Sequence, residues 1–373
     1  MPFASFQPPR RILMGPGPSD VPVRILEAVA RPTIGHLDPA FITMMDEIKA
    51  MLQQAFRTGN ELTFVVSGPG TAGMETCFAN LVEPGDHVIV YVNGYFGNRM
   101  REMVERYGGT PIALEGEWGR PADPRRVHGA LQEHPEAKAV AFVHAETSTG
   151  ALSDAAEIVK LCRQSRVLSI VDAVTSLGGL PVDVDGWGVD AIYSGSQKCL
   201  SCVPGLSPVS FGPRALDRLK SRRRKVQSWF LDLTMIVDYW SGTGKRAYHH
   251  TAPINSLYGF HEALVMLHEE GLENAWARHR RVSDLLRNGL QRLGLQPFVP
   301  ESERIPQLTA VRVPDGVDEA AVRTALLEKY GIEIGAGLGP LAGKIWRIGL
   351  MGHSCREENV ELCLGALRDE LRR

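Results

Sequence analysis

The feature that most constrains the fold is an alternation of short apolar runs and helical stretches between about residues 60 and 210. Several of these runs are apolar at consecutive positions, which is typical of strands buried on both faces of a parallel sheet. Strands separated by helices in this order predict an α/β domain with a doubly wound sheet. The expected strands are residues 62–66, 87–92, 139–144, 167–171, 191–193 and 208–211, and the expected helices include 74–81, 98–107 and 154–165.

The pattern changes near residue 254, where longer helical stretches and fewer strands follow. A length of 373 residues is compatible with about two to three domains. We therefore expect an N-terminal arm at residues 1–20, a large domain at 21–270 and a smaller α+β domain at 271–373. In the last part, the expected helices are 254–270, 273–293, 319–329 and 357–371, and the expected strands are 309–313 and 346–350.

Composition excludes several classes of protein. Apolar residues make up 44% of the chain, enough for a large core, and the net charge of −2 offers no global field for nucleic acid or anionic membranes. Six scattered cysteines are typical of reduced thiols, and neither an apolar signal segment nor a membrane-length apolar run is present. We expect a cytoplasmic protein that binds neither membranes nor nucleic acid, with the basic run Ser221–Lys225 as a solvated helix end.

No metal site is expected. Cys199 and Cys202 have the spacing of one zinc half-site, but no second pair of ligands accompanies them. His249 and His250 are adjacent, so on a strand or a helix their side chains would point apart.

A glycine-rich segment, Gly68–Gly73, follows the first expected strand and precedes a helix. Such a turn can direct unpaired N–H groups and the helix dipole at a phosphate. The same spacing fits the dinucleotide fingerprint, but that interpretation requires an acid about 20 residues later, where the chain has Asn93. A phosphate-binding turn, a nicotinamide site and a plain tight turn remain the three interpretations.

Two residues close apolar strands at what should be the carboxyl edge of the sheet, where open α/β folds bind ligands. Asp172 ends the run 167–171 and could serve either a ligand or the N-cap of the next segment. Lys198 follows the run 191–193 after small hydroxyl and glycine residues. Most lysines are solvated, but a desolvated lysine near another cation can lose its proton and act as a Schiff-base nucleophile.

A phosphate-binding turn, a strand-end acid and a strand-end amine are together the three groups that pyridoxal 5′-phosphate needs from a protein. Arg347, on an apolar strand of the expected small domain, could bind a substrate carboxylate bidentately or form a surface ion pair. A second glycine-rich stretch, Gly335–Gly339, is expected to be a flexible turn at the domain interface.

Segments along nearly the whole chain resemble the class V aminotransferases of pyridoxal-phosphate fold type I. Within that class the chain is similar to the alanine–glyoxylate and serine–glyoxylate (serine–pyruvate) enzymes. The segments that carry the resemblance are residues 14–18 (MGPGP), 45–48 (MDEI), 94–97 (GYFG), 144–150 (HAETSTG), 171–173 (VDA), 194–198 (SGSQK), 248–251 (YHHT) and 346–350 (WRIGL). The resemblance implies a mainly parallel seven-stranded sheet, bound pyridoxal phosphate, amino acid and 2-oxo acid substrates, and a homodimer with shared active sites.

The resemblance also implies roles for individual residues. Lys198 matches the lysine that forms the Schiff base, and Asp172 matches the partner of the pyridine nitrogen. Gly70 and Thr71 match the phosphate-binding turn, and Gln197 is also placed at the phosphate.

Further matches concern the ring, the neighbouring subunit and the substrate. Thr147 matches the hydroxyl near O3′ of the cofactor, and Phe96 stands where some members stack a tryptophan on its ring. Tyr248 and Thr251 match residues that reach the phosphate of the neighbouring subunit. Two matches concern the substrate: Arg347 at the carboxylate and Gly17 near the mouth of the site.

The activity expected from this resemblance is transfer of the amino group of L-alanine to glyoxylate by a ping-pong mechanism. Serine–glyoxylate and serine–pyruvate transamination are close alternatives, and ureidoglycine–glyoxylate or aminoethylphosphonate transfer is more distant. Cysteine desulfuration would need a mobile nucleophilic thiol, for which Cys355 is the nearest candidate. Outside the family, the alternative is a nicotinamide-dependent oxidoreductase that uses Gly68–Gly73.

Overall fold

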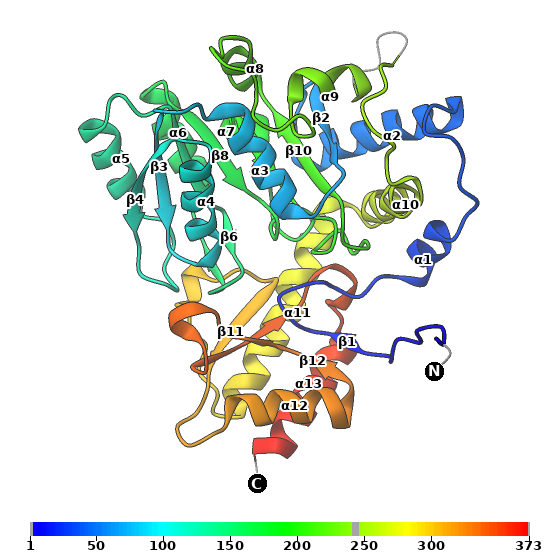
Figure 1. Ribbon diagram of the computed structural model, residues 1–373. Coiled ribbons are helices and arrows are strands. Elements are labelled where there is room, and N and C mark those ends of the chain that lie inside the picture. The colour runs from blue at the N-terminus through cyan, green and yellow to red at the C-terminus, as the bar shows by residue number, and fades with distance from the viewer. Residues whose placement is uncertain (1–2, 241–245, 372–373) are drawn as a thin grey trace.

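The structure, a computed structural model, describes residues 3–240 and 246–371, so residues 1–2 and 372–373 of the expected arm and small domain lie outside the described residues. A seven-stranded sheet forms the centre of the upper half in Figure 1, in the order β2-β10-β9-β8-β5-β3-β4. Strand β10 runs antiparallel to its neighbours β2 and β9, and all other neighbouring strands of this sheet are parallel, which confirms the expected mainly parallel, doubly wound sheet. Its strands are β2 (Leu62–Val66), β3 (His87–Val92), β4 (Thr110–Glu115), β5 (Ala139–Val143), β8 (Leu168–Asp172), β9 (Ala191–Tyr193) and β10 (Ser207–Phe211).

The edge strand β4 is the one strand of this sheet that the apolar runs did not predict. Its residues are half-buried or exposed, and it contains Pro111, which is tolerated at a sheet edge. Strands β2, β5, β8, β9 and β10 are buried at every position, as the consecutive apolar residues predict.

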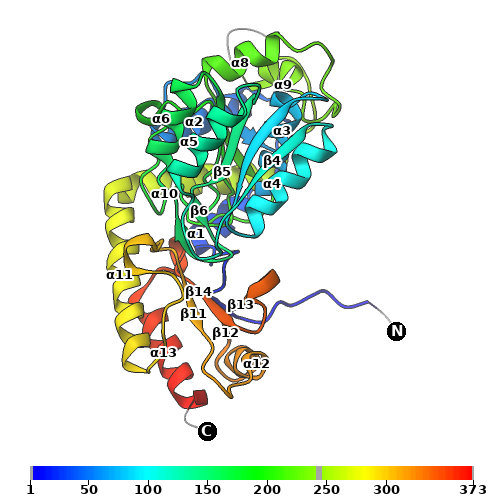
Figure 2. The ribbon, with the colours of Figure 1, turned by 90° about the vertical axis from the view of Figure 1, so that its left-hand side faces the viewer.

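Helices cover both faces of the sheet, and Figure 2 shows α5 and α6 beside one face and α3 and α4 beside the other. Among residues 3–240 and 246–371, no helix combines the length and the apolar character needed to cross a membrane. The helices of this half are α1 (Val23–Val29), α2 (Pro39–Phe56), α3 (Gly70–Leu81), α4 (Tyr95–Arg106), α5 (Pro124–Glu133), α6 (Ala155–Gln164), α7 (Val184–Trp187), α8 (Pro213–Lys220), α9 (Leu233–Trp240) and α10 (Ile254–Glu270).

Helix α3 begins at Gly70, four residues before the expected start near Met74, so the glycine-rich turn is itself the first turn of the helix. The two glycines permit close packing. A Cβ on Gly73 would lie 3.2 Å from the Cβ of Tyr193 on β9, and one on Gly70 would lie 3.2 Å from Cγ2 of Val174. Because glycine has a low helix propensity, the sequence pattern placed the start of this helix too late.

The C-terminal half, in the lower part of Figure 1, has an antiparallel sheet of order β11-β14-β13 packed with three helices. Its helices are α11 (Leu272–Arg292), α12 (Glu319–Tyr330) and α13 (Glu357–Leu371), and its strands are β11 (Leu308–Arg312), β12 (Ile332–Glu333), β13 (Gly335–Ala336) and β14 (Ile345–Gly349). Short elements complete the described chain: β1 (Ile12–Leu13), β6 (Ala145–Glu146), β7 (Ala151–Leu152) and the 3₁₀ turns η1 (Glu301–Glu303), η2 (Gly339–Leu341) and η3 (Gly352–Ser354).

The start of the chain joins its last third. Strand β1 pairs in parallel with β12, with Ile12 opposite Ile332. Met14 is fully buried in the same apolar core as Val282, Trp346 and other residues of the C-terminal half. The chain then crosses to the large sheet, so the turn that follows Met14 lies between the two halves.

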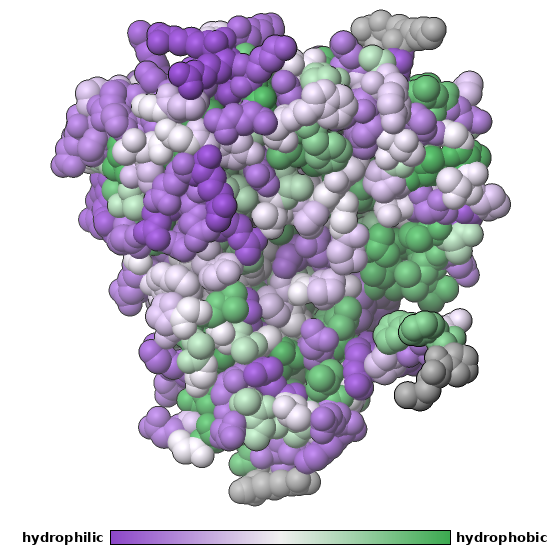
Figure 3. All heavy atoms as spheres, viewed as in Figure 1, coloured by the Kyte–Doolittle hydropathy of each residue, from purple (hydrophilic) through white to green (hydrophobic). Residues whose placement is uncertain are grey.

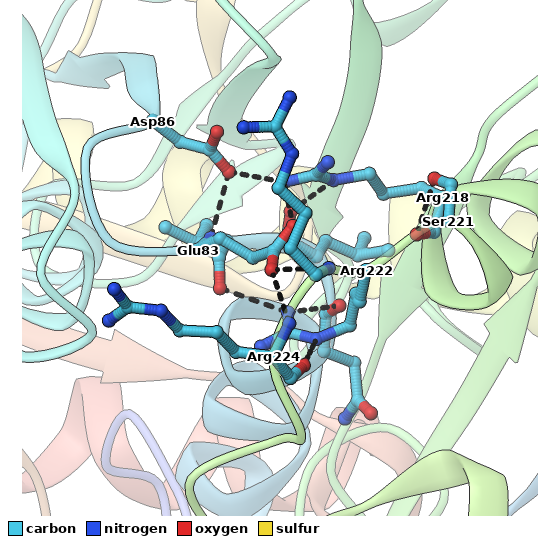
Figure 4. Close-up of polar contacts among 10 residues, drawn as sticks. Glu83, Asp86, Arg218, Ser221, Arg222 and Arg224 are labelled. Atoms are coloured by element: carbon cyan, nitrogen blue, oxygen red, sulfur yellow. Dashed lines mark hydrogen bonds and ion pairs between the residues drawn. The ribbon is translucent and has the colours of Figure 1, made fainter.

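The basic run Ser221–Lys225 lies against the loop between α3 and β3 (Figure 4). Arg222 is half-buried and donates to the carbonyls of Asn80 (2.8 Å) and Val82 (3.0 Å). The backbone N–H groups of Arg223 and Arg224 donate to Glu83 at 2.9 and 3.1 Å. The expectation of a solvated helix end is therefore wrong for Arg222, which binds the C-terminal end of α3. The expectation holds for the exposed neighbours of Arg222.

Candidate active site at the carboxyl edge of the sheet

Lys198 lies at the carboxyl edge of the sheet, five residues after Tyr193 ends β9. Small hydroxyl residues fix the intervening loop: the hydroxyl of Ser194 donates to the carbonyl of Ala173 (3.0 Å) and that of Ser196 to the carbonyl of Val203 (2.7 Å). Lys198 is only 8% exposed, and its Nζ donates to the carbonyl of Pro16. Burial, and secondly the charge of Arg347, lowers the pKa of this amine to about 8.

Asp172 ends β8, next to β9, and is paired in register with Tyr193. The hydroxyl of Tyr193 donates to its Oδ2, and the N–H of Val174 donates to its Oδ1, both at 2.8 Å. Burial raises the pKa of this carboxyl to about 7, while these hydrogen bonds and, more weakly, the charge of Lys198 lower it. This geometry is compatible with both expected roles of Asp172. One carboxylate oxygen accepts from the backbone of the following segment, as a cap would, and the carboxyl group lies at the edge that carries Lys198, where a ligand would bind.

The turn after Met14 lies directly on Lys198. Gly17 has a φ of +109°, and a Cβ at this position would lie 2.8 Å from Cδ and 2.9 Å from Cε of Lys198. A larger residue at Gly17 would therefore be strained and would displace the lysine. The structure brings this predicted substrate contact to the predicted catalytic amine.

The expected phosphate-binding turn begins α3. Gly70 and Thr71 are its first two residues, so their N–H groups have no intrahelical partner. The hydroxyl of Thr71 accepts a hydrogen bond from Nη1 of Arg99 (2.8 Å). Gly70 packs against Val174, two residues after Asp172, which brings this turn to the same edge of the sheet.

Gln197 and Phe96 are partly buried beside this edge. The Oε1 atom of Gln197 is buried and has no hydrogen-bond partner. Phe96 is in the first turn of α4, and the guanidinium carbon of Arg99 lies 5.0 Å from the centre of its ring.

Arg347 is buried in β14 and is oriented by two carbonyls. Its Nε donates to Ala336 (2.6 Å) and its Nη1 donates to Thr147 (3.1 Å). Burial lowers the pKa of this guanidinium to about 10, while the nearby carboxylate of Glu146 raises it. Within the described part of the chain Arg347 makes no ion pair, so the alternative of a surface ion pair is wrong.

The stretch Gly335–Gly339 is not a turn throughout, as its glycines suggested, because it begins with a strand. Gly335 and Ala336 form strand β13, which pairs with Arg347 and Trp346 of β14. The absence of a side chain at Gly335 permits the close approach of Pro16, because a Cβ there would lie 2.5 Å from Cδ of Pro16. This strand supplies the Ala336 carbonyl that orients the arginine.

Tyr248 and Thr251 are exposed and are not brought to Lys198 within one chain. Tyr248 is 62% exposed, and its ring centre lies 5.2 Å from that of His36. Between them, His249 and His250 approach each other with their Nδ1 atoms 2.7 Å apart. The expectation that these two side chains point apart is wrong because the segment is neither helix nor strand.

The sequence interpretation assigned no role to Glu146, Tyr193 or Arg99. Glu146 is fully buried beside Thr147, and burial raises the pKa of its carboxyl. Tyr193 binds Asp172, and Arg99 contacts both Thr71 and the ring of Phe96. A charged residue inside the segment 144–150, next to an apolar strand, was the one available signal for Glu146.

The residues at this edge fit pyridoxal phosphate. An amine with a lowered pKa and a buried carboxylate lie at the ends of adjacent parallel-sheet strands. A helix N-terminus suited to a phosphate and the unpartnered amide oxygen of Gln197 accompany them. The dinucleotide alternative is not supported, because Asn93 is 1% exposed and donates to the carbonyl of Arg120 (2.8 Å) instead of presenting an acid.

Comparison with known proteins agrees with this chemistry. Residues 24–360 match the family model for aminotransferase class-V. The chain is 41% identical to the alanine–glyoxylate aminotransferase of Callithrix jacchus, with 97% of this chain and 88% of the relative covered. It is 39% identical to the (S)-ureidoglycine–glyoxylate transaminase of Bacillus subtilis, with 98% and 91% covered.

Comparison with a solved structure indicates the same family. The alanine–glyoxylate aminotransferase of Nostoc sp. superposes with a TM-score of 0.97 at 46% identity, with 100% of this chain and 98% of that chain covered. The chain is therefore an aminotransferase of the class-V family, whose members use pyridoxal 5′-phosphate as cofactor.

Proposed function

We propose that this aminotransferase transfers the amino group of L-alanine to glyoxylate and releases pyruvate and glycine in a ping-pong reaction. The observation that carries the proposal is the arrangement of Lys198, Asp172 and the carbonyl-oriented Arg347 around one site, closed by the Pro16–Gly17 turn. That turn leaves little room beside the amine, which favours substrates with small side chains. Both the Callithrix and the Nostoc relatives are alanine–glyoxylate aminotransferases.

When bound, pyridoxal phosphate supplies an aldehyde that combines with amines and a ring that takes up the electron pair of the broken Cα–H bond. Lys198 would hold the cofactor through Nζ, and the same atom would act as the general base that takes the Cα proton of the substrate. Its lowered pKa of about 8 leaves a useful fraction of the amine uncharged near neutral pH.

Asp172 would bind the pyridine nitrogen of the cofactor and favour a proton on it. Its Oδ2 already accepts from Tyr193, which fixes the orientation of the carboxylate. A cation at the ring nitrogen would compensate the burial of Asp172 and keep this carboxylate ionised.

Residues around the ring and phosphate complete the site. Gly70 and Thr71 bind the phosphate through N–H groups at the start of α3, and Gln197 binds beside them. Phe96 would stack on the ring, and Thr147 would bind near its O3′ atom.

Replacing Arg347 with alanine should raise the KM of both alanine and glyoxylate, because each substrate carries a carboxylate that binds this guanidinium. Loss of the buried ion pair between Arg347 and the substrate carboxylate should cost about 2–5 kcal/mol of transition-state binding. This cost is measured as a fall in kcat/KM. Steady-state kinetics with each substrate varied in turn measures this. Arg347→Lys is the matched control, since it keeps the charge but loses the bidentate geometry and should recover only part of the activity. An unchanged KM for either substrate would remove Arg347 from this role.

The active protein in this proposal is a homodimer in which Tyr248 and Thr251 reach the phosphate of the partner. Figure 3 shows hydrophobic residues gathered on the side that carries α1 and the N-terminal segment. The exposed apolar side chains there include Phe3, Phe6, Val23 and Leu26. A second copy of the chain would bury this surface.

Two measurements test the dimer. Sedimentation should give twice the chain mass. Mixing a Lys198→Ala chain with a Tyr248→Ala chain should restore part of the activity, because one hybrid site would contain neither substitution. A monomer with full activity would contradict this proposal.

We also propose the three-part division into residues 1–20, 21–270 and 271–373. The large core includes residues from Ile25 to Ala275, and the second core joins Met14 to residues between Val282 and Leu367. The active site lies where these parts meet, since Lys198 is in the large part and Arg347 in the small one.

A second candidate function is ureidoglycine–glyoxylate transfer. It is supported by the Bacillus transaminase, which is nearly as similar as the alanine-specific relatives. A desulfurase is not supported, because Cys355 is buried and burial raises the pKa of its thiol to about 12.

A donor panel tests the proposed function directly. The holoenzyme is assayed with alanine, serine, (S)-ureidoglycine and 2-aminoethylphosphonate, each with glyoxylate and with pyruvate, and the released oxo product is identified. We expect the highest kcat/KM for alanine with glyoxylate. A higher value for serine or ureidoglycine would replace the proposed donor, and no turnover with any amino donor would reject the function.

A further inference from the structure

Helix α4 begins at Tyr95 without a cap from its own segment, because its N-cap residue is Gly94. The partners of its first N–H groups come from a distant loop. The N–H of Tyr95 donates to the hydroxyl of Ser148 (2.9 Å), and the N–H of Phe96 donates to Oε2 of Glu146 (3.2 Å). This tertiary cap explains why α4 starts three residues before the expected residue 98.

Glu146 is a fully buried carboxylate whose two oxygens are occupied by donors. Its Oε1 accepts from the N–H (2.9 Å) and the hydroxyl (2.7 Å) of Ser148. Together with the N–H of Phe96, three donors point at this group. They and the N-terminal dipole of α4 stabilise a negative charge that burial would otherwise disfavour.

Gly94 allows the two segments to meet. Its φ of −179° is an extended conformation that any residue can adopt. A Cβ there, however, would lie 2.6 Å from Oγ of Ser148 and would overlap the side chain of Glu146. The glycine is therefore required for close approach and not for its conformation.

The two segments joined in this way carry residues that contact the cofactor in the proposed function. The capped turn of α4 carries Phe96, and Thr147 lies between Glu146 and Ser148. The same segment touches the substrate arginine, because Nη1 of Arg347 donates to the carbonyl of Thr147 (3.1 Å). Glu146 and Ser148 each bind a backbone N–H at the start of α4 through the side chain, and they are also hydrogen-bonded to each other.

We propose that Glu146, together with Ser148, is a positioning residue of the active site that caps α4 and thereby fixes Phe96 and Thr147 against the cofactor. This inference rests on the proposed function. The role requires a carboxylate: a glutamine would direct its NH₂ group at one pair of donors, and at least one buried N–H would lose its acceptor.

The test uses Glu146→Gln and measures cofactor binding to the apoenzyme. We expect the Kd for pyridoxal phosphate to rise about tenfold, as the loss of one buried hydrogen bond predicts. The visible circular dichroism of the bound cofactor should also change, because the ring would stack less regularly. Ser148→Ala should act in the same direction and serves as the second variant if Glu146→Gln fails to fold.

A double-mutant cycle shows whether Glu146 acts through Phe96. In Phe96→Ala, the further change Glu146→Gln should weaken cofactor binding by much less than it does in the wild type. The matched control is Asp318→Ala, which removes the cap of α12, bonded to the N–H of Ala321 at 3.0 Å, and should leave cofactor binding unchanged.

The outcomes separate this inference from the proposed function. A wild-type Kd and dichroism in both Glu146→Gln and Ser148→Ala would overturn the positioning role, as would full additivity with Phe96→Ala. Failure of the wild-type holoenzyme to turn over any donor in the panel would instead reject the proposed function. The measured effects of Glu146→Gln and Ser148→Ala on cofactor binding would not be affected by that result.

Discussion

Replacement of Lys198 with alanine is expected to stop turnover almost completely while leaving the chain folded. The variant loses the amine that binds the cofactor and the base that takes the Cα proton. Loss of proton transfer alone should lower kcat roughly 10²- to 10⁴-fold, and loss of covalent attachment should lower it further. Single-turnover measurements with alanine, followed by absorbance of the cofactor, give the rate.

The matched control is Lys160→Ala, which removes an exposed lysine paired with Glu157 on α6 (3.0 Å) and should keep wild-type activity. Thermal unfolding of the Lys198→Ala apoenzyme should remain cooperative, because the side chain contributes an amine and not a large apolar contact. Added methylamine should restore part of the rate, since a small amine can occupy the space left by Lys198 and accept the proton. Activity above one tenth of the wild type without added amine would contradict the role of Lys198.

Asp172→Asn is expected to have the second-largest effect. The amide is similar in size and can still accept from Tyr193, but it cannot hold a positive charge at the ring nitrogen. Breaking a buried ion pair costs about 3–5 kcal/mol, which corresponds to a loss of roughly 10²- to 5 × 10³-fold in kcat. Steady-state kinetics and cofactor titration should show that kcat falls much more than cofactor affinity.

A cofactor analogue distinguishes this electrostatic role from damage to the fold. Pyridoxal phosphate methylated at the ring nitrogen carries a permanent positive charge and needs no carboxylate to keep it. The analogue should raise the kcat of Asp172→Asn relative to ordinary pyridoxal phosphate and should not raise that of the wild type. Equal rates with both cofactors in the variant would show that Asp172 does not act on this nitrogen.

The sheet and the two strand-end residues were predictable from the sequence because their placement depends on local patterns. Consecutive apolar residues identify buried strands, and parallel strands end at one edge, so Asp172 and Lys198 had to lie on the same side of the sheet. The structure confirms this placement. It adds that burial shifts the pKa of both groups toward neutrality.

The features that sequence patterns missed depend on tertiary contacts. The early start of α4 needs Glu146 and Ser148, about 50 residues away. The strand at Gly335 and Ala336 needs β14 beside it, and its glycine masked that pairing. The turn at Gly17 depends on a chain that leaves the second core at Met14 and crosses to Lys198. None of these contacts has a local signature that a single sequence shows.

The central claim is that the amine of Lys198 is the group to which the cofactor becomes attached. Treating the holoenzyme with sodium borohydride converts a reversible carbon–nitrogen double bond into a stable single bond, and peptide mass spectrometry then locates the modified residue. We expect one phosphopyridoxyl group per chain, on the peptide that contains Lys198. Stoichiometric labelling of another lysine, with Lys198 unmodified, would contradict the account.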